Sequence, residues 1–185
     1  MIAALQFKLT LVDAKPAIWR RLVVPSKITL KQLHEIFQAV TGWEDTHEHE
    51  FVIAERRYGQ PAPREIVPVQ NEALFRLHSL PLTEGTRFAY VYDFGDHWQI
   101  EVKVERVLER DPGGPSPTVL DGARAFPPEN SGGISGYEDL LEALSNPDDP
   151  EHEECRGWVD DDFDPERFDL GATYERLRLV ANKAG

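Results

Sequence analysis

The stretch TRFAYVYDFGDHWQIEVKV, residues 86–104, alternates apolar and polar side chains on both sides of a short polar turn. Alternation with a period of two predicts strands over 86–92 and 98–104. The turn over 93–97 is short enough to join the two strands as an antiparallel hairpin. This hairpin indicates a sheet-containing protein, and the rest of the chain is interpreted around it.

The turn of this hairpin gathers titratable and aromatic groups around one glycine. Gly95 is expected to take a positive φ, while the carboxylates of Asp93 and Asp96 accept backbone hydrogen bonds. His97 and Trp98 follow directly along the chain. Such a mixture suits a rigid site as well as a buried turn, and both interpretations stay open at this point.

Upstream of the hairpin, the sequence predicts two strands and a helix. Leu5–Leu11 alternates with a period of two, and Ile18–Val24 returns as a second strand. Thr29 offers an N-cap with Gln32 three residues later, which is a capping box, and Gly42 ends the helix. The apolar residues of the helix fall on one stripe: Leu30, Leu33, Ile36, Phe37 and Val40. A hairpin followed by an amphipathic helix resembles the opening of a β-grasp fold.

Between the helix and the hairpin, residues 47–53 are expected to form another strand, and 59–68 a proline-containing loop. After the hairpin, residues 111–136 are rich in proline and glycine. They predict an irregular excursion instead of a flexible linker, because it carries apolar residues to bury. These apolar residues are Val119, Leu120 and Phe126.

Helix signals dominate the C-terminal part. Ser135 and Glu138 form a second capping box, before a helix that contains Tyr137, Leu140, Leu141 and Leu144. Asp149-Pro150 and Asp164-Pro165 each resemble an N-cap followed by proline at the first helical position. The last helix is expected over about 165–181.

Together these elements predict an α+β fold in a single domain, residues 1–185. A mostly antiparallel sheet with the amphipathic helix packed on it occupies 1–108, the excursion 109–136 and a helical C-terminal region 137–185. A chain of 185 residues with 41% hydrophobic content can bury a core without disulfides. Its single cysteine, Cys155, has no partner within the chain.

Charge and hydropathy narrow the partners and the location. The formal net charge is -13, so the chain lacks the global field that attracts nucleic acid. Polar residues interrupt the first apolar stretch, which therefore resembles neither a signal peptide nor a membrane span. We expect a soluble cytoplasmic protein with no membrane association.

The polar clusters raise the question of a metal site. His47 and His49 lie two apart on an expected strand, so both imidazoles should point to the same side, and Asp93 and Asp96 could complete a shell of nitrogen and oxygen ligands. The spacing is less specific than a zinc motif with cysteine pairs. The alternative is that the histidines are hydrogen-bonded structural residues near a strand end.

The sequence argues against two other kinds of site, a kinase magnesium site and a calcium-binding loop. Asp93-Phe94-Gly95 matches a kinase magnesium motif, but no glycine-rich loop or catalytic-loop signature accompanies it. The aspartates of residues 160–164 imitate the start of a calcium loop, which needs glycine at its sixth position and glutamate at its twelfth, where this chain has Pro165 and Gly171.

Several short motifs occur in a characteristic order. They are Ala17-Ile18-Trp19-Arg20-Arg21, Leu33-His34-Glu35, Gly42-Trp43, His47-Glu48-His49-Glu50-Phe51, Tyr92-Asp93-Phe94-Gly95-Asp96-His97-Trp98, Leu120-Asp121-Gly122-Ala123-Arg124-Ala125, Pro127-Pro128-Glu129-Asn130, Gly132-Gly133 to Gly136-Tyr137, Asp164-Pro165-Glu166 and Phe168-Asp169. In this order they resemble the plasmid pRi open-reading-frame-three-like family, often described as TnpR-type passenger proteins of mobile elements. The resemblance spans nearly the whole chain and implies an α+β fold with a mostly antiparallel sheet. It implies no particular biochemical activity.

The chain departs from the family pattern at positions that bear on metal binding. Many relatives carry cysteines where this chain has Val119, Phe126 and Ser131, and often a histidine where it has Ile100. The resemblance therefore implies that a metal site shared through those side chains is lost or reduced here.

Two hypotheses about the function of the protein remain open. The favoured hypothesis is a non-enzymatic binding or adaptor module that holds a protein or a small ligand on its acidic surface or between the His47 strand and the Asp93 hairpin. The candidate ligand-binding residues are His47, His49, Asp93, Asp96, His97 and Trp98. The alternative is a metal-assisted hydrolase in which His47, His49, Asp93 and Asp96 hold one divalent ion.

Overall fold

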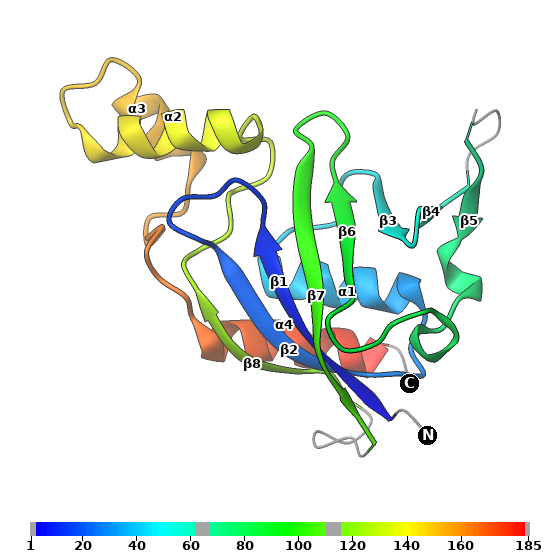
Figure 1. Ribbon diagram of the computed structural model, residues 1–185. Helices are drawn as coiled ribbons and strands as arrows, with labels where there is room; N and C mark the ends of the chain where they lie inside the picture. Colours follow the sequence, from blue (N-terminus) through cyan, green and yellow to red (C-terminus); the bar gives the residue numbers. More distant parts are fainter. Residues whose placement is uncertain (1–2, 62–66, 110–115, 184–185) are drawn as a thin grey trace.

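The computed structural model describes residues 3–61, 67–109 and 116–183, and it shows a sheet-rich mixed α/β protein (Figure 1). The described strands form one eight-stranded sheet in the order β5-β4-β3-β6-β7-β1-β2-β8. Their bounds are β1 Ala4–Leu11, β2 Trp19–Pro25, β3 His49–Ile53, β4 Arg56–Gly59, β5 Val69–Asn71, β6 Arg87–Tyr92, β7 Trp98–Leu108 and β8 Thr118–Ala123. Neighbouring strands in this sheet pair antiparallel, except β4 and β5, which run parallel.

The predicted hairpin forms β6 and β7, with Tyr92 opposite Trp98 at the turn. The first predicted strand forms β1, which pairs with β7 on one edge and β2 on the other. Its alternate residues Leu5, Phe7, Leu9 and Leu11 are all buried, as the period of two requires. The strands of residues 86–104 and 5–24 thus form the centre of the sheet, as their patterns predict.

Helix α1, Leu30–Thr41, confirms the helix prediction at both ends. The Thr29 hydroxyl accepts a hydrogen bond from the backbone N–H of Gln32, and Oε1 of Gln32 accepts one from the backbone N–H of Thr29, which completes the capping box. Gly42 ends the helix in the left-handed conformation with φ 88°. Its apolar stripe is buried in the main core: Leu30, Leu33, Ile36, Phe37 and Val40.

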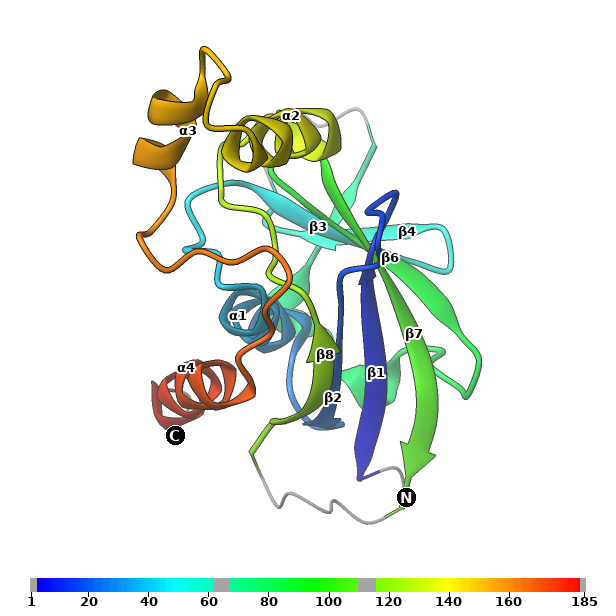
Figure 2. The same cartoon turned by 90° about the vertical axis from the view of Figure 1, so that its left-hand side faces the viewer.

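Helix α4, Leu170–Lys183, lies beside α1 on the same face of the sheet (Figure 2). Arg20 of β2 lies buried between these elements, where its Nε donates to the carbonyl of Val40 at 3.1 Å. Its guanidinium stacks on the rings of Phe126 and Phe168. Burial, together with the nearby charge of Arg176, lowers the pKa of Arg20 to about 9.

The proline- and glycine-rich segment is more regular than predicted, because it contains β8, which pairs with β2. Its first prolines, Pro112 and Pro115, lie outside the described residues. Val119 and Phe126 are buried as expected, but Leu120 is 43% exposed. The reason is that β8 is an edge strand, on which successive side chains point to opposite faces.

Residues 59–68 were predicted as a loop, and 62–66 of these lie outside the described residues. The short strands β4 and β5 that flank the segment were not predicted. β3 begins at His49, two residues later than predicted, and β7 extends to Leu108.

The helix starts predicted in the C-terminal part are wrong. Helix α2, Gly133–Ser145, begins after Gly132, so the proposed Ser135 cap lies inside it. Helix α3, His152–Trp158, follows Glu151, and α4 begins at Leu170, where Asp169 accepts a hydrogen bond from the backbone of Ala172. The carboxylates of Asp149 and Asp164 instead accept the backbone N–H two residues later, which closes turns around the prolines.

Helices α2 and α3 lie at the end of the molecule opposite both chain termini, beyond the β1–β2 connection (Figures 1 and 2). Among the described residues, no helix has the length and apolar character needed to cross a membrane.

Candidate functional site

The β6–β7 turn is held by Asp93, which is buried at the end of β6. Its Oδ1 accepts hydrogen bonds from the backbone N–H of Gly95 at 2.9 Å and of Asp96 at 3.2 Å. The positive φ that was predicted for Gly95 is instead taken by Asp93, at 57°, and His97, at 56°. The aspartate side chain stabilises this conformation by bonding to its own turn, as short polar side chains do in the left-handed region.

Asp96 joins this turn to the start of α2. Its Oδ2 accepts a hydrogen bond from the backbone N–H of Gly132 at 3.0 Å. Gly133 has φ 69°, and a Cβ built there would lie 2.5 Å from the backbone oxygen of Asp96. Only glycine fits at this contact, so the Asp96 turn and the Gly132-Gly133 pair form one structural joint.

His47 lies just before β3, at the rim of a pocket. Its Nε2 is 2.9 Å from Asn130 Oδ1 and 3.5 Å from Asp93 Oδ2. The structure therefore places His47 beside Asp93, as the sequence hypothesis requires.

The side chain of His49 has different partners from that of His47. Its side chain is buried, and Nε2 lies 2.8 Å from Oε2 of Glu72, whose side chain is 2% exposed. Its ring stacks on His34 of α1, with centroids 3.4 Å apart and an interplanar angle of 1°. His47 and His49, which the sequence expects to point to the same side, therefore have different partners although both line one pocket, and β3 begins only at His49, so strand alternation does not extend to His47.

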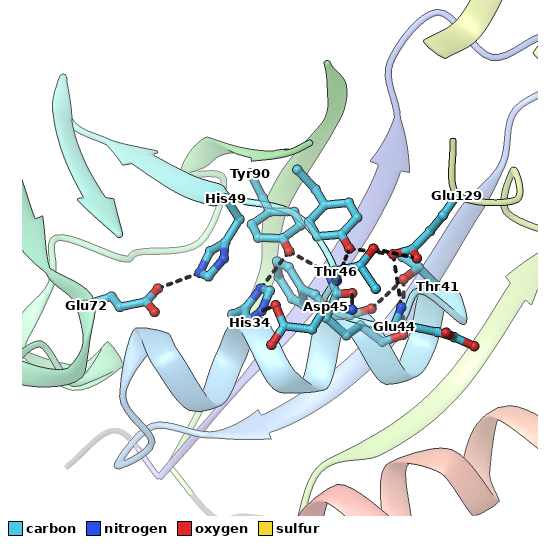
Figure 3. A network of polar contacts seen from close by, with 12 residues as sticks. His34, Thr41, Glu44, Asp45, Thr46, His49, Glu72, Tyr90 and Glu129 are labelled. Atoms are coloured by element: carbon cyan, nitrogen blue, oxygen red, sulfur yellow. Dashed lines mark hydrogen bonds and ion pairs between the residues drawn. The ribbon is translucent and has the colours of Figure 1, made fainter. Parts of the chain in front are cut away.

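His34 and its neighbours form a buried polar network (Figure 3). His34 Nε2 lies 2.8 Å from Asp45 Oδ1, and His34 Nδ1 lies 2.7 Å from the Tyr90 hydroxyl. Gln38 donates to the same hydroxyl at 2.9 Å and accepts from the backbone of Asp45 at 2.9 Å. Burial, followed by the nearby His49, lowers the pKa of His34 to about 4, so the ring is neutral at pH 7.

One group of three side chains among the described residues brings potential metal-ligand atoms within 4.8 Å of one another: His34, Asp45 and His49. The predicted set of His47, His49, Asp93 and Asp96 is not such a group. Its members are divided among the pocket rim, the buried histidine pair and the joint with α2.

A pocket of about 330 Å³ opens beside β3. Its lining residues are Asp45, Thr46, His47, Glu48, His49, Glu50, Arg57, Gln60, Val69 and Phe94. Arg57 is paired with Glu50, since its Nε lies 2.6 Å from Glu50 Oε2. Phe94, at the tip of the β6–β7 turn, is 46% exposed.

The other two predicted candidates lie away from this pocket lining. Trp98 is buried in the main core, where its ring is tilted against Trp43 at 6.1 Å. His97 is exposed, and its backbone N–H donates to the carbonyl of Asp93 at 2.6 Å.

A second part of the network connects the segment after α1 to residues 127–130 (Figure 3). Trp43 stacks on Tyr92 at 4.9 Å and donates from Nε1 to the carbonyl of Pro127 at 2.9 Å. The hydroxyl of Tyr92 donates to Glu129, which also accepts from Thr46 Oγ1 at 3.0 Å. Burial, and then the hydrogen bond to Glu129, raises the pKa of Tyr92 to about 12.

Sequence reasoning missed His34, Asp45, Glu72 and Tyr90 as members of a polar site. One signal was present: His34 lies on the apolar stripe of α1 between Leu33 and Phe37, where a titratable side chain is buried and needs partners. The partners themselves lie in the segment between α1 and β3, on β3, on β6 and in the short helical turn Glu72–Leu74.

Comparisons with known proteins assign this arrangement to a family. The family described as plasmid pRiA4b ORF-3-like protein matches residues 3–172. The chain belongs to the plasmid pRiA4b ORF-3-like family. Several motif segments of this pRiA4b ORF-3-like protein meet in space, because Trp43 contacts Pro127, Tyr92 contacts Glu129 and His47 contacts Asn130.

Two proteins similar to this pRiA4b ORF-3-like protein carry no stated activity. Uncharacterized protein y4hQ of Sinorhizobium fredii (strain NBRC 101917 / NGR234) is 35% identical over 160 residues, which cover 85% of this chain and 82% of that protein. The crystal structure of MM3350, a protein of unknown function from Methanosarcina mazei Go1, is similar with a TM-score of 0.81 and 39% identity. The match covers 90% of this chain and 95% of MM3350.

Proposed function

We propose that this pRiA4b ORF-3-like protein is a non-enzymatic binding module whose pocket beside β3 holds the positively charged group of an amine or guanidinium compound. The observation that carries this proposal is the charge of the pocket. Among the described residues, Asp45, Glu48 and Glu50 line it together with one cationic side chain, Arg57, whose charge is already paired with Glu50. The uncompensated carboxylates favour a cationic ligand.

The rim of the pocket supports the same chemistry. Phe94 offers a partly exposed aromatic ring, which attracts cations through its electron-rich face and covers the apolar part of a ligand. The ligand source is either a small polyamine or a lysine or arginine side chain of a protein. The second source corresponds to an adaptor role. A TnpR-type passenger role, and the association with mobile elements and the cytoplasm, stay predictions from the family resemblance and the composition.

The test is calorimetric titration of the purified chain with spermidine and, separately, with a short lysine- and arginine-containing peptide. Glu48→Gln removes one exposed pocket carboxylate and should weaken binding about two- to fivefold. Glu138→Gln, which makes the same change on the exposed face of α2, should leave binding unchanged. Binding of the peptide alone assigns the adaptor role, and the absence of heat with both ligands contradicts the proposal.

The alternative hypothesis is a hydrolase with one metal ion held by His47, His49, Asp93 and Asp96. The distance of 3.5 Å between His47 Nε2 and Asp93 Oδ2 supports one pair of this ligand set. Asp96 and His49 do not support it, because Asp96 accepts a hydrogen bond from Gly132 at the joint with α2, and the ring of His49 lies against His34 and Glu72 instead of Asp93. We therefore keep the binding module as the proposed function.

A further inference from the structure

The buried pair of His34 and His49 has unusual surroundings. Two imidazoles in van der Waals contact cannot both carry a charge without strong repulsion, and each has a carboxylate oxygen 2.8 Å from its Nε2. The carboxylates are Asp45 and Glu72. The four side chains therefore combine two carboxylates with two closely stacked imidazole rings.

Glu72 provides an independent observation that favours a cation at this site. Its side chain is 2% exposed, and its Oε1 is buried with no hydrogen-bond partner among the described residues. A buried carboxylate with an unpaired oxygen is costly unless positive charge lies nearby. Oε2 of the same carboxylate contacts the imidazole of His49.

We propose that His34, Asp45 and His49 bind one divalent first-row transition-metal ion, with Glu72 as the carboxylate that orients His49. Ligand atoms of the three side chains already lie within 4.8 Å of one another. Two imidazole nitrogens, one carboxylate oxygen and no thiolate suit Zn²⁺, Co²⁺ or Ni²⁺ better than Ca²⁺ or Mg²⁺, which prefer oxygen ligands only.

The hydrogen bonds select the ligating atoms. Glu72 holds Nε2–H of His49, which leaves Nδ1 of His49 for the metal. Tyr90 occupies Nδ1 of His34, which leaves Nε2, the atom next to Asp45. Both histidines thus have an outer partner on one nitrogen, the arrangement that fixes ring orientation in protein metal sites.

Coordination requires a small movement. An imidazole nitrogen binds a metal in the plane of its ring, so the two parallel rings must tilt toward a common point. The Asp45 side chain is 57% exposed and is able to follow. Asp45 and His49 also line the pocket, so the proposed site adjoins space that is open to ligands.

The test uses the full chain purified without an affinity tag, stripped with a chelator and then dialysed against Zn²⁺. We expect about one zinc ion per chain by elemental analysis, and a cobalt absorption band typical of nitrogen and oxygen ligands when Co²⁺ is used. Asp45→Asn changes an exposed side chain, so folding is retained, and it should weaken zinc binding at least about tenfold. Asp139→Asn on α2 is the matched control and should bind as the unmodified chain does.

Two further variants make the outcome decisive. Glu72→Gln should weaken zinc binding about 10- to 100-fold but leave spermidine binding intact, whereas Glu48→Gln should do the reverse. The metal proposal and the amine proposal therefore fail separately. The metal proposal is overturned if the unmodified chain retains no zinc, if Asp45→Asn binds zinc as tightly as the unmodified chain, or if His47→Ala, and not Asp45→Asn, abolishes binding.

Discussion

At the scale of single residues, His34 illustrates how a local pattern places a titratable group in the core. The helical stripe that buries Leu33 and Phe37 buries His34 with them. Its two nitrogens are satisfied by Tyr90 and Asp45, so the neutral ring is stable there although a charged ring is not.

This burial predicts a pH dependence of folding. The pKa of His34 is about 4 in the folded chain, mainly because of burial, against an ordinary value of about 6.5 in the unfolded chain. Between these two pH values the unfolded chain binds more protons than the folded chain. The free energy of unfolding therefore decreases as the pH falls. The contribution of neutral His34 to the free energy of unfolding should be fully present above about pH 6.5. It should decrease by up to about 3 kcal/mol as the pH falls toward 4, with no further loss from this group at lower pH.

Urea unfolding at several pH values between 4.5 and 7.5, with chelator present, measures this effect. In His34→Gln the part of the pH slope that belongs to His34 should disappear. Equal slopes in the variant and the unmodified chain would show that His34 is not the group that titrates.

At the scale of elements, the joint between the β6–β7 turn and the start of α2 explains why two distant motifs occur together. Asp96 caps the backbone of Gly132, and Gly133 lies against the carbonyl of Asp96. This contact is structural, and it accounts for the two motifs without a catalytic role. In the structure the Asp93–His97 segment is a turn in which Asp93 is buried and Phe94, Gly95 and His97 are exposed, with Phe94 as the part that reaches the pocket.

Gly133→Ala should destabilise the chain by about 2 kcal/mol or more, because φ is positive and the new methyl group would meet the Asp96 carbonyl at 2.5 Å. Gly157→Ala in α3 is the matched control. Nothing lies within 4 Å of its Cβ position, and its φ is not positive, so alanine should be neutral or stabilise the chain by up to about 1 kcal/mol. Thermal unfolding of both variants checks the difference, and equal melting temperatures would contradict the proposed joint.

At the scale of the whole molecule, the net charge of -13 surrounds the pocket with a negative field. Salt screens this field, since the screening length falls from about 10 Å at 0.1 M to about 3 Å at 1 M. If the pocket holds a cationic ligand, the affinity for spermidine should fall about tenfold between 0.05 and 0.5 M salt. Zinc binding by His34, Asp45 and His49 should change less, because the bonds to the ion are direct.

Calorimetric titration of spermidine at several salt concentrations provides the measurement. An affinity that does not change with salt would mean that apolar contacts, such as those of Phe94, dominate the binding.

Local sequence signals predicted much of the fold. The period of two in residues 5–11 and 86–104, and the capping box of Thr29 with its apolar stripe, correspond to β1, β6, β7 and α1. These signals succeed because each depends on neighbours a few residues apart. The predicted caps at Asp149 and Asp164 are wrong because such side chains close turns as readily as they begin helices, and packing selects between the two. The cap at Ser135 is wrong because α2 begins two residues earlier, at Gly133.

The candidate site depended on contacts that no local pattern contains. His34, His49 and Glu72 belong to a helix, a strand and a short helical turn, and they meet only when α1 crosses the sheet. The sequence alone determined that polar groups gather around residues 47–49 and 93–98. The tertiary structure decided which of them face one another, because chain segments far apart in sequence have to pack before their side chains can form a pocket.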